Sequence, residues 1–379
     1  MNIAYVVPNL QQTGPIIVVQ SLVKFLANDN FIVVYYIDEC NYPIAMGCET
    51  KKIFYDEPFP FDDYDIIHCH TAKSDLYAFF WMNDMHHPFV LTTIHQDSFY
   101  TEKLRLGSVK GNIYTHMWLK VQRQFDGQIT ISKQIKNLYQ KYFPKEINVI
   151  YNGVNCEDGE LDKSIVKQIN DFKRERDNSV LLGTYALITK RKGLIQVLRL
   201  LVEKPKYQFL VIGDGPEVGG LKQFAVEKGI SDRVLFVGHI DKPYNYLDAV
   251  DIYVMPSYSE AFGLAVVEAA LRHKAIACSE LDSFHEIFHH NEVEFFKHDD
   301  VLSMDAALQK LYHNKCKYEH LAFERVNSEF SASIMAQNTI GYYHKLINMQ
   351  TGVNRKFTPP SLLLVKLIKY LFCLMIKKR

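Results

Sequence analysis

Two carboxylates, Glu260 and Glu268, stand eight positions apart around a Phe-Gly turn in the segment Glu260-Ala-Phe-Gly-Leu-Ala-Val-Val-Glu268. The apolar run 250–255 upstream predicts a buried strand, and the apolar run after the turn predicts a helix. A strand, a tight loop and a helix N-terminus together present free N–H groups and a positive dipole end, which favour a bound phosphate. Beside it, Glu260 could accept hydrogen bonds from sugar hydroxyls, and Glu268, about two turns into the helix, could reach a ribose. The simpler alternative is a dipole-stabilised glutamate followed by a solvated one.

This segment resembles the E-x7-E signature of retaining GT-B glycosyltransferases of family GT4, also called group 1. Other segments resemble further motifs of that family and follow in the family's order: 1–8, 130–133, 149–154, 192–193, 211–216 and 234–238. The resemblance covers most of the chain. It implies an α/β fold of the GT-B type, with two Rossmann-like doubly wound domains facing across a cleft. It also implies transfer of a sugar from a nucleotide-sugar donor with retention of configuration.

Negative charge develops on the donor's diphosphate as its bond to the sugar breaks, and cationic side chains can stabilise that charge. The family pattern Gly-Arg-Leu-x-x-x-Lys-Gly aligns with residues 186–193, so that Lys192 matches the family's lysine. Leu187 stands where the family has arginine. Half of the expected phosphate clamp is therefore missing, and Lys190 or Arg191 could substitute. The alternative for this stretch is a basic, solvated turn before a helix.

Two further loops follow predicted strands. Gly14 allows close backbone approach and Pro15 suits a first helical position, while Thr13 replaces the first glycine of a frequent family pair. This loop is expected over the diphosphate and the transferred sugar, unless it is a simple βα turn. His95 ends the run 90–95, where the family often has a histidine facing the transferred sugar.

The resemblance thus gives two groups of candidate site residues. Those for catalysis are Glu260 and His95, and those for donor binding are Thr13, Gly14, Lys192, Arg191, Phe262, Gly263, Leu264 and Glu268.

No metal site and no cofactor are expected, because in the fold resembled lysine and helix dipoles replace the ion and the nucleotide sugar is a co-substrate. Asp62 and Asp63 precede a predicted strand and fit a cap or turn better than a metal site. His68 and His70 look like a metal pair, but they lack further ligands at a set spacing. We interpret them as histidines at the edge of a sheet.

Short β-branched runs alternate with helical stretches, which predicts parallel sheets covered by helices. We expect an acceptor-side domain at 1–155 and a donor-binding domain at 156–330. An amphipathic crossover helix at 331–349 should pack back onto the first domain. The predicted strands are 3–7, 32–37, 66–68, 89–94, 127–131 and 148–151 in the first domain, and 181–185, 208–212, 234–237, 252–255 and 274–278 in the second.

Composition narrows the function classes. The chain has 379 residues, 48% of them apolar, which is enough for two full-sized cores. The formal net charge is zero, which argues against a nucleic-acid partner. Seven scattered cysteines without a Cys-x-x-Cys pair fit a reducing cytoplasm, and no signal peptide is recognised.

The C-terminal segment 359–379 predicts a basic amphipathic helix. Lys366, Lys369, Cys373 and Lys377 share one narrow stripe, and the rest of the surface is apolar. Such a helix would lie in a membrane interface through 361–379, although docking on the protein's own surface is the alternative. We therefore expect a cytoplasmic protein, peripheral on the inner face of the cell membrane.

A membrane location suggests a lipid-linked glycan acceptor, in the synthesis of a surface polysaccharide or glycolipid. The first alternative is a non-catalytic homologue that binds a nucleotide sugar or serves as a partner subunit, which Leu187 keeps open. The other alternative is a soluble enzyme acting on a free sugar or a sugar phosphate. The base, sugar, acceptor and linkage are left open by the sequence.

Overall fold

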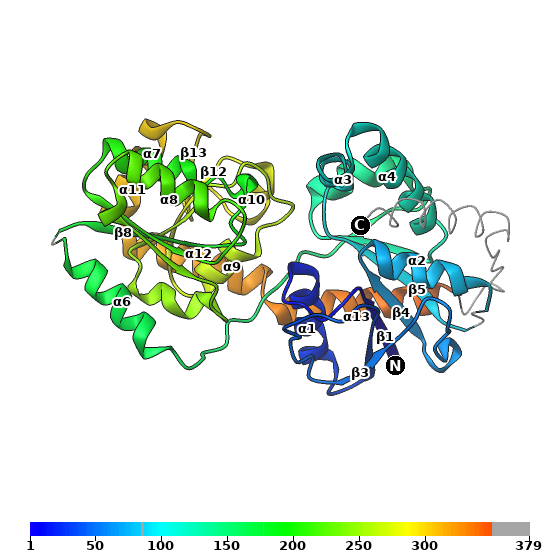
Figure 1. Ribbon diagram of the computed structural model, residues 1–379. Helices are drawn as coiled ribbons and strands as arrows, with labels where there is room; N and C mark the ends of the chain where they lie inside the picture. Colours follow the sequence, from blue (N-terminus) through cyan, green and yellow to red (C-terminus); the bar gives the residue numbers. More distant parts are fainter. Residues whose placement is uncertain (85–86, 177, 351–379) are drawn as a thin grey trace. The chain divides into compact units, whose positions relative to one another are not determined.

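The computed structural model describes residues 1–84, 87–176 and 178–350, and these form two compact units. Unit 1 contains Met1–Gly153 and the last described helix, α13 (Ala332–Gln350). Unit 2 is Val154–Ser331. Each unit is a parallel sheet with helices on both faces (Figure 1), so the predicted α/β architecture is confirmed. The predicted tail helix at 359–379 lies outside the described residues.

The sheet of unit 1 has seven strands in the order β3-β2-β1-β4-β5-β6-β7, all of them parallel. The strands are β1 (Asn2–Val7), β2 (Phe31–Tyr36), β3 (Glu49–Lys52), β4 (Ile66–His70), β5 (Phe89–Ile94), β6 (Gly127–Thr130) and β7 (Asn148–Val149). β1 pairs with both β2 and β4, so Tyr5 lies between Val34 and His68. The direction of strand succession therefore reverses between β1 and β4.

The helices of unit 1 bury their apolar faces against this sheet. The main ones are α1 (Gly14–Leu26), α2 (Ala72–Trp81), α3 (Ser98–Leu106), α4 (Ser108–Gln122) and α5 (Lys133–Tyr139). Residues from β1, β2, β4, α2 and α4 share one buried core that includes Phe79, Trp118 and Phe125. α13 packs along α1, and the hydroxyl of its Tyr343 lies 3.2 Å from that of Tyr5. The last helix is thus part of the first unit.

Unit 2 repeats the same plan with six parallel strands in the order β10-β9-β8-β11-β12-β13. The strands are β8 (Val180–Tyr185), β9 (Tyr207–Ile212), β10 (Val234–Gly238), β11 (Ile252–Met255), β12 (Ala275–Ser279) and β13 (Glu294–Phe296). The helices are α6 (Lys163–Arg174), α7 (Ile195–Glu203), α8 (Val218–Glu227), α9 (Leu264–Leu271), α10 (Asp282–Ile287), α11 (Val301–His313) and α12 (Lys315–Glu329). The reversal here falls between β8 and β11.

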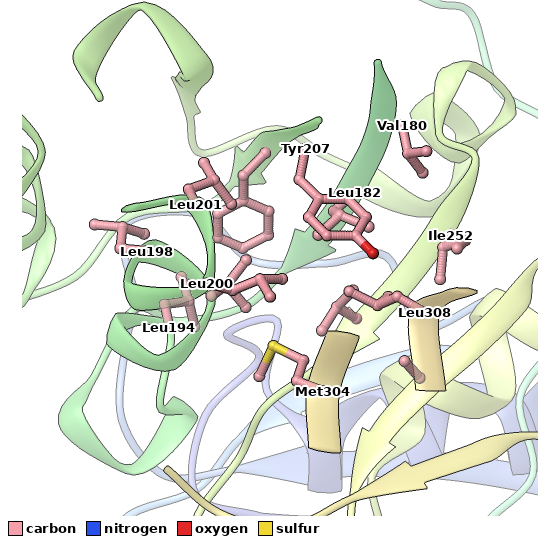
Figure 2. Close-up of a cluster of buried hydrophobic side chains, with 14 of the residues drawn as sticks. Val180, Leu182, Leu194, Leu198, Leu200, Leu201, Tyr207, Ile252, Met304 and Leu308 are labelled. Carbon is pink, nitrogen blue, oxygen red and sulfur yellow. The ribbon is translucent and has the colours of Figure 1, made fainter. Parts of the chain in front are cut away.

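One buried cluster holds β8, β9 and β11 against α7 and α11 (Figure 2). Leu182, Leu198 and Leu201 are fully buried in it, and Met304 and Leu308 contribute from α11. Burying a leucine side chain stabilises a fold by roughly 1.5–3 kcal/mol. This core fixes the carboxyl ends of β8 and β11, from which the candidate site residues of unit 2 follow.

Two strands were not predicted from the sequence. β3 consists of Glu-Thr-Lys-Lys, and all four residues are exposed at one edge of the sheet. β13 is three residues long and forms the other sheet's edge. Neither has the apolar run that marks a central parallel strand. Among the described residues, no helix has the length and apolar character needed to cross a membrane.

Candidate functional site

In unit 2, the loops after β8 and β11 meet at the point where strand succession reverses. In open α/β sheets, ligands bind outside the carboxyl ends of the strands at such a reversal. The loop after β8 carries Arg191 and Lys192, and the loop after β11 carries Glu260. The sheet topology alone therefore brings three of the predicted site residues to one place.

The two loops pack backbone against backbone. The Tyr258 N–H donates to the Arg191 carbonyl oxygen at 2.8 Å. Gly193 has a φ of +63°, and a Cβ at this position would lie 2.1 Å from the Pro256 carbonyl oxygen. Any side chain here would push the loops apart. The glycine after Lys192 is therefore required for the approach of the lysine to Glu260.

Glu260 is the centre of a compact ion-pair group. Nζ of Lys192 donates to its Oε1 at 2.7 Å, and the Ser257 hydroxyl donates to the same oxygen at 2.9 Å. An Nη1–Oε2 distance of 3.0 Å joins Arg191 to the other oxygen. Burial by itself would raise the pKa of Glu260, but the two cations together lower that pKa below its ordinary value. The side chain is charged and held in one orientation.

Glu260 is almost buried, although it lies in a loop after a strand. Its side chain is 8% exposed, and Lys192 is 14% exposed, because each covers the other. The local sequence could not show this, since the partners are 68 residues apart. The ammonium of Lys192 has three donors, so its bond to Glu260 leaves donors for a phosphate.

Arg191 supplies the guanidinium that the leucine at position 187 cannot provide. Leu187 is 69% exposed on the loop after β8. Nη1 of Arg191 donates to the Ser259 carbonyl oxygen at 2.6 Å and contacts Oε2 of Glu260, whereas Lys192 bonds to Oε1. Two cations therefore flank one carboxylate, even though the family's arginine position holds leucine.

The Phe-Gly turn forms the start of α9. Gly263 precedes the helix with a φ of +98°, and a Cβ there would lie 2.5 Å from the Phe284 ring. Within the described chain, no side chain caps the helix at this end. The Phe262 side chain is 2% exposed and packs near Phe330, so only its backbone can take part in a binding surface. Leu264 is the first residue of α9 and is partly exposed.

Glu268 is not a solvated helix residue. It is partly buried, and its Oε2 accepts a hydrogen bond from the Tyr185 hydroxyl at 2.6 Å. Burial raises the pKa of Glu268 to about 7, against smaller opposing effects of Tyr185 and Lys192. Tyr185 ends β8 and was missed in the sequence, where it looks like an ordinary strand aromatic. It positions one carboxylate oxygen and leaves the other available.

Unit 1 has its own group at the reversal of strand succession. His70 ends β4 and His95 follows β5, and Nδ1 of His70 lies 2.8 Å from Nε2 of His95. His68 lies 2.6 Å from the Tyr343 hydroxyl and 2.8 Å from that of Thr93. Burial lowers the pKa of His68 and of His95 to about 3. These imidazoles are therefore neutral at ordinary pH.

His68 and His70 lie at the carboxyl end of β4, as their strand-end position predicted, but they are buried within the sheet and not at an exposed edge. β4 is a central strand, and these side chains are 1% and 0% exposed. His68 contacts Tyr343, 275 residues away, and His70 contacts His95, 25 residues away. A local sequence pattern cannot reveal such contacts. In the described part of the chain, no group of three or more His, Cys, Asp or Glu side chains could hold a metal ion.

The loop after β1 leads into a helix, as the sequence predicted. α1 begins at Gly14 with Pro15 in its first turn, and the exposed Thr13 precedes it. The Thr13 side chain does not cap the helix. Since β1 and β5 both pair with β4, this loop and His95 leave the same end of the sheet.

Comparisons with known proteins agree with this arrangement. The family described as "Glycosyl transferases group 1" matches residues 162–324, and "Glycosyltransferase Family 4" matches residues 43–158. The O-antigen biosynthesis glycosyltransferase WclY of Escherichia coli is 27% identical over 357 residues, covering 91% of this chain and 99% of the relative. A UDP-Gal:alpha-D-GlcNAc-diphosphoundecaprenol alpha-1,3-galactosyltransferase of Escherichia coli is 28% identical over 228 residues, covering 55% of this chain and 56% of the relative.

Solved structures share the fold. Anabaena Alr3699/HepE in complex with UDP and glucose superimposes with a TM-score of 0.74 at 16% identity, over 90% of this chain and 99% of that one. Sucrose-phosphate synthase from Thermosynechococcus elongatus gives a TM-score of 0.73 at 20% identity, over 92% of this chain and 100% of that one. The two family matches meet between residues 158 and 162, close to the boundary between the two units. The chain therefore belongs to the family 4, group 1 glycosyltransferases and has their GT-B fold.

Proposed function

We propose that this glycosyltransferase moves a sugar from a nucleotide-sugar donor to a hydroxyl of a lipid-linked glycan, with retention, in the synthesis of a surface polysaccharide. The observation that carries the proposal is the group formed by Lys192, Arg191 and Glu260 at the strand reversal of unit 2. The acceptor class follows the relatives: one is named for O-antigen biosynthesis and another for a diphosphoundecaprenol-linked sugar.

The cations of unit 2 suit a nucleoside diphosphate. Lys192 and Arg191 bind the diphosphate with the donors that Glu260 does not occupy. The N–H groups at the start of α9, after Gly263, add the positive end of a helix dipole. Glu268 accepts a hydrogen bond from a ribose hydroxyl with the oxygen that Tyr185 leaves available. These contacts need no metal ion, so the reaction is proposed to be metal-independent.

The reaction breaks the bond between the anomeric carbon and the donor phosphate oxygen and forms a bond from that carbon to the acceptor oxygen. The acceptor's proton passes to the departing phosphate oxygen, and a nucleoside diphosphate leaves. Lys192 and Arg191 stabilise the negative charge that develops on that leaving group. Glu260 orients both cations and accepts hydrogen bonds from the transferred sugar. From unit 1, His95 and the loop Thr13–Gly14 are proposed to contact the same sugar.

The full-length protein should be tested with a panel of UDP-, GDP- and dTDP-sugars and a polyprenyl-diphosphate-linked sugar acceptor. We expect one donor to give a glycosylated lipid whose new anomeric centre keeps the donor's configuration by NMR. Chelator should leave the rate unchanged; a loss restored by a divalent ion would contradict the metal-independent mechanism. If a donor binds by calorimetry but no acceptor is glycosylated, the non-catalytic alternative gains support.

A further inference from the structure

The helical pair α3–α4 of unit 1 exposes large apolar side chains. Tyr100 and Leu104 on α3 are 43% and 69% exposed, and Val109 and Ile113 on α4 are 73% and 52% exposed. Leu104 and Val109 flank the single linking residue Gly107, at the end of the pair. A folded protein exposes single apolar residues routinely, but several within one short segment mark an interaction surface.

The pair is built so that these residues cannot turn inward. α3 and α4 lie side by side (Figure 1), and a Cβ at Gly111 would lie 2.5 Å from the Glu102 carbonyl oxygen. The Thr115 hydroxyl donates to the Ser98 carbonyl oxygen at 3.2 Å. On its other face, α4 buries Trp118, whose Nε1 donates to Asp75 at 2.6 Å. The inner face is fixed, so the outer face is fixed too.

The exposed charges around these residues are positive. Lys103, Arg105 and Lys110 are exposed close to Gly107. The one acidic side chain in the pair, Glu102, is 7% exposed and accepts a bond from Nε of Arg105 at 2.7 Å. We call Lys103, Leu104, Val109, Lys110 and Ile113 the hairpin tip.

We propose that the hairpin tip binds an anionic lipid surface, with Leu104, Val109 and Ile113 in the headgroup layer and the two lysines at lipid phosphates. Apolar residues among cations are the combination that holds a protein in a membrane interface. Each lysine near such a surface is attracted to the anionic headgroups. The end of a two-helix pair is small. A stable protein partner needs about 800 Å² per side, so lipid is the better match.

The hairpin tip belongs to unit 1, whereas the residues proposed to bind the diphosphate belong to unit 2. Vesicle binding requires neither donor nor acceptor, so the proposal stands or falls independently of the transferase reaction. It adds a membrane contact within the described part of unit 1.

The test places a reporter at the tip of the full-length protein. The chain has two tryptophans, so Val109→Trp adds a third at a position that is 73% exposed. Val226→Trp is the matched control, since Val226 is 70% exposed on unit 2. On phosphatidylglycerol vesicles, we expect brominated acyl chains to quench the Val109→Trp emission and to leave the Val226→Trp emission at the level of the parent protein. Equal quenching of the two variants, or none, overturns the proposal.

A charge test complements the reporter. Lys103→Gln/Lys110→Gln should lower binding to phosphatidylglycerol vesicles several-fold, whereas Lys167→Gln/Lys228→Gln on unit 2 should not. On phosphatidylcholine vesicles, the first pair should have no effect. If Val109→Asp instead dissociates a dimer in sedimentation velocity while vesicle binding is unchanged, the tip binds a second copy of the chain and the lipid proposal is wrong.

Discussion

Nζ of Lys192 lies 2.7 Å from Oε1 of Glu260. The residue proposed to bind the diphosphate is therefore hydrogen-bonded directly to the residue proposed to bind the sugar. The two functions are coupled in this structure. Changing either residue alters the other's surroundings, and the predictions for them are best tested as pairs.

Glu260→Gln should lower turnover more than tenfold. The amide keeps the side chain's shape but loses the charge that orients Lys192 and Arg191. Because the carboxylate is 8% exposed and ion-paired, the variant should also unfold more easily, by about 1–3 kcal/mol. Steady-state kinetics and thermal unfolding measure the two effects. Near-normal turnover would remove Glu260 from the site.

Lys192→Ala should weaken binding of the free nucleoside diphosphate. A charge-assisted hydrogen bond contributes about 1.5–3 kcal/mol, or roughly ten- to a hundredfold in affinity. Lys190→Ala is the matched control, because Lys190 is an exposed lysine of the same short helical turn. Titration calorimetry compares them. If Lys192→Ala binds the diphosphate as tightly as the parent protein, another group, such as Arg191 or the helix N-terminus, holds the diphosphate.

Glu268 should make stability depend on pH. Its pKa rises from 4.5 to about 7 on folding, so between these values the folded state binds a proton that the unfolded state has released. The free energy of unfolding should therefore fall as the pH rises from about 4.5 to about 7. In Glu268→Gln this contribution disappears, and urea unfolding across that range should show a flatter profile. An unchanged profile would mean that Glu268 ionises normally.

His95→Ala should lower the rate of sugar transfer but leave the affinity for the free nucleoside diphosphate almost unchanged. The reason is that the imidazole is proposed to contact the sugar and not the phosphates. His70→Ala should reproduce part of this loss, because it removes the nitrogen 2.8 Å from Nε2 of His95. With the pKa of His95 near 3, neither the parent rate nor its KM should show a histidine ionisation between pH 5 and 8. Full activity of His95→Ala would place the sugar elsewhere.

Deleting residues 359–379 should reduce sedimentation with anionic vesicles and leave nucleoside diphosphate binding unaltered. The amphipathic pattern gives this segment an apolar surface that lipid would cover and lysines that suit anionic headgroups. High salt should strip the full-length protein only partly, because apolar burial persists when charges are screened. If the truncated and full-length chains sediment alike, the segment has no role in membrane binding.

The parallel sheets were predictable because central strands such as β1 and β11 contain continuous apolar runs. β3 and β13 were not, since exposed edge strands need no such run. In the site, the sequence could point to Glu260 and Lys192 through their positions after strands. It could not show that they bond to each other, or that Tyr185 holds Glu268, because those contacts join loops and strands far apart in the chain.

Unit 1 consists of two separate stretches of the chain, and this affects the order in which the units can fold during synthesis. Tyr343 of α13 bonds to Tyr5 and His68, which precede it by 338 and 275 residues. While the ribosome is still making unit 2, the first 153 residues therefore lack the helix that pairs with these buried groups. Unit 2 is continuous and can finish folding first. The nascent chain should hold its earliest strands incompletely packed until α13 emerges, and a chaperone that binds early apolar surface would act on unit 1.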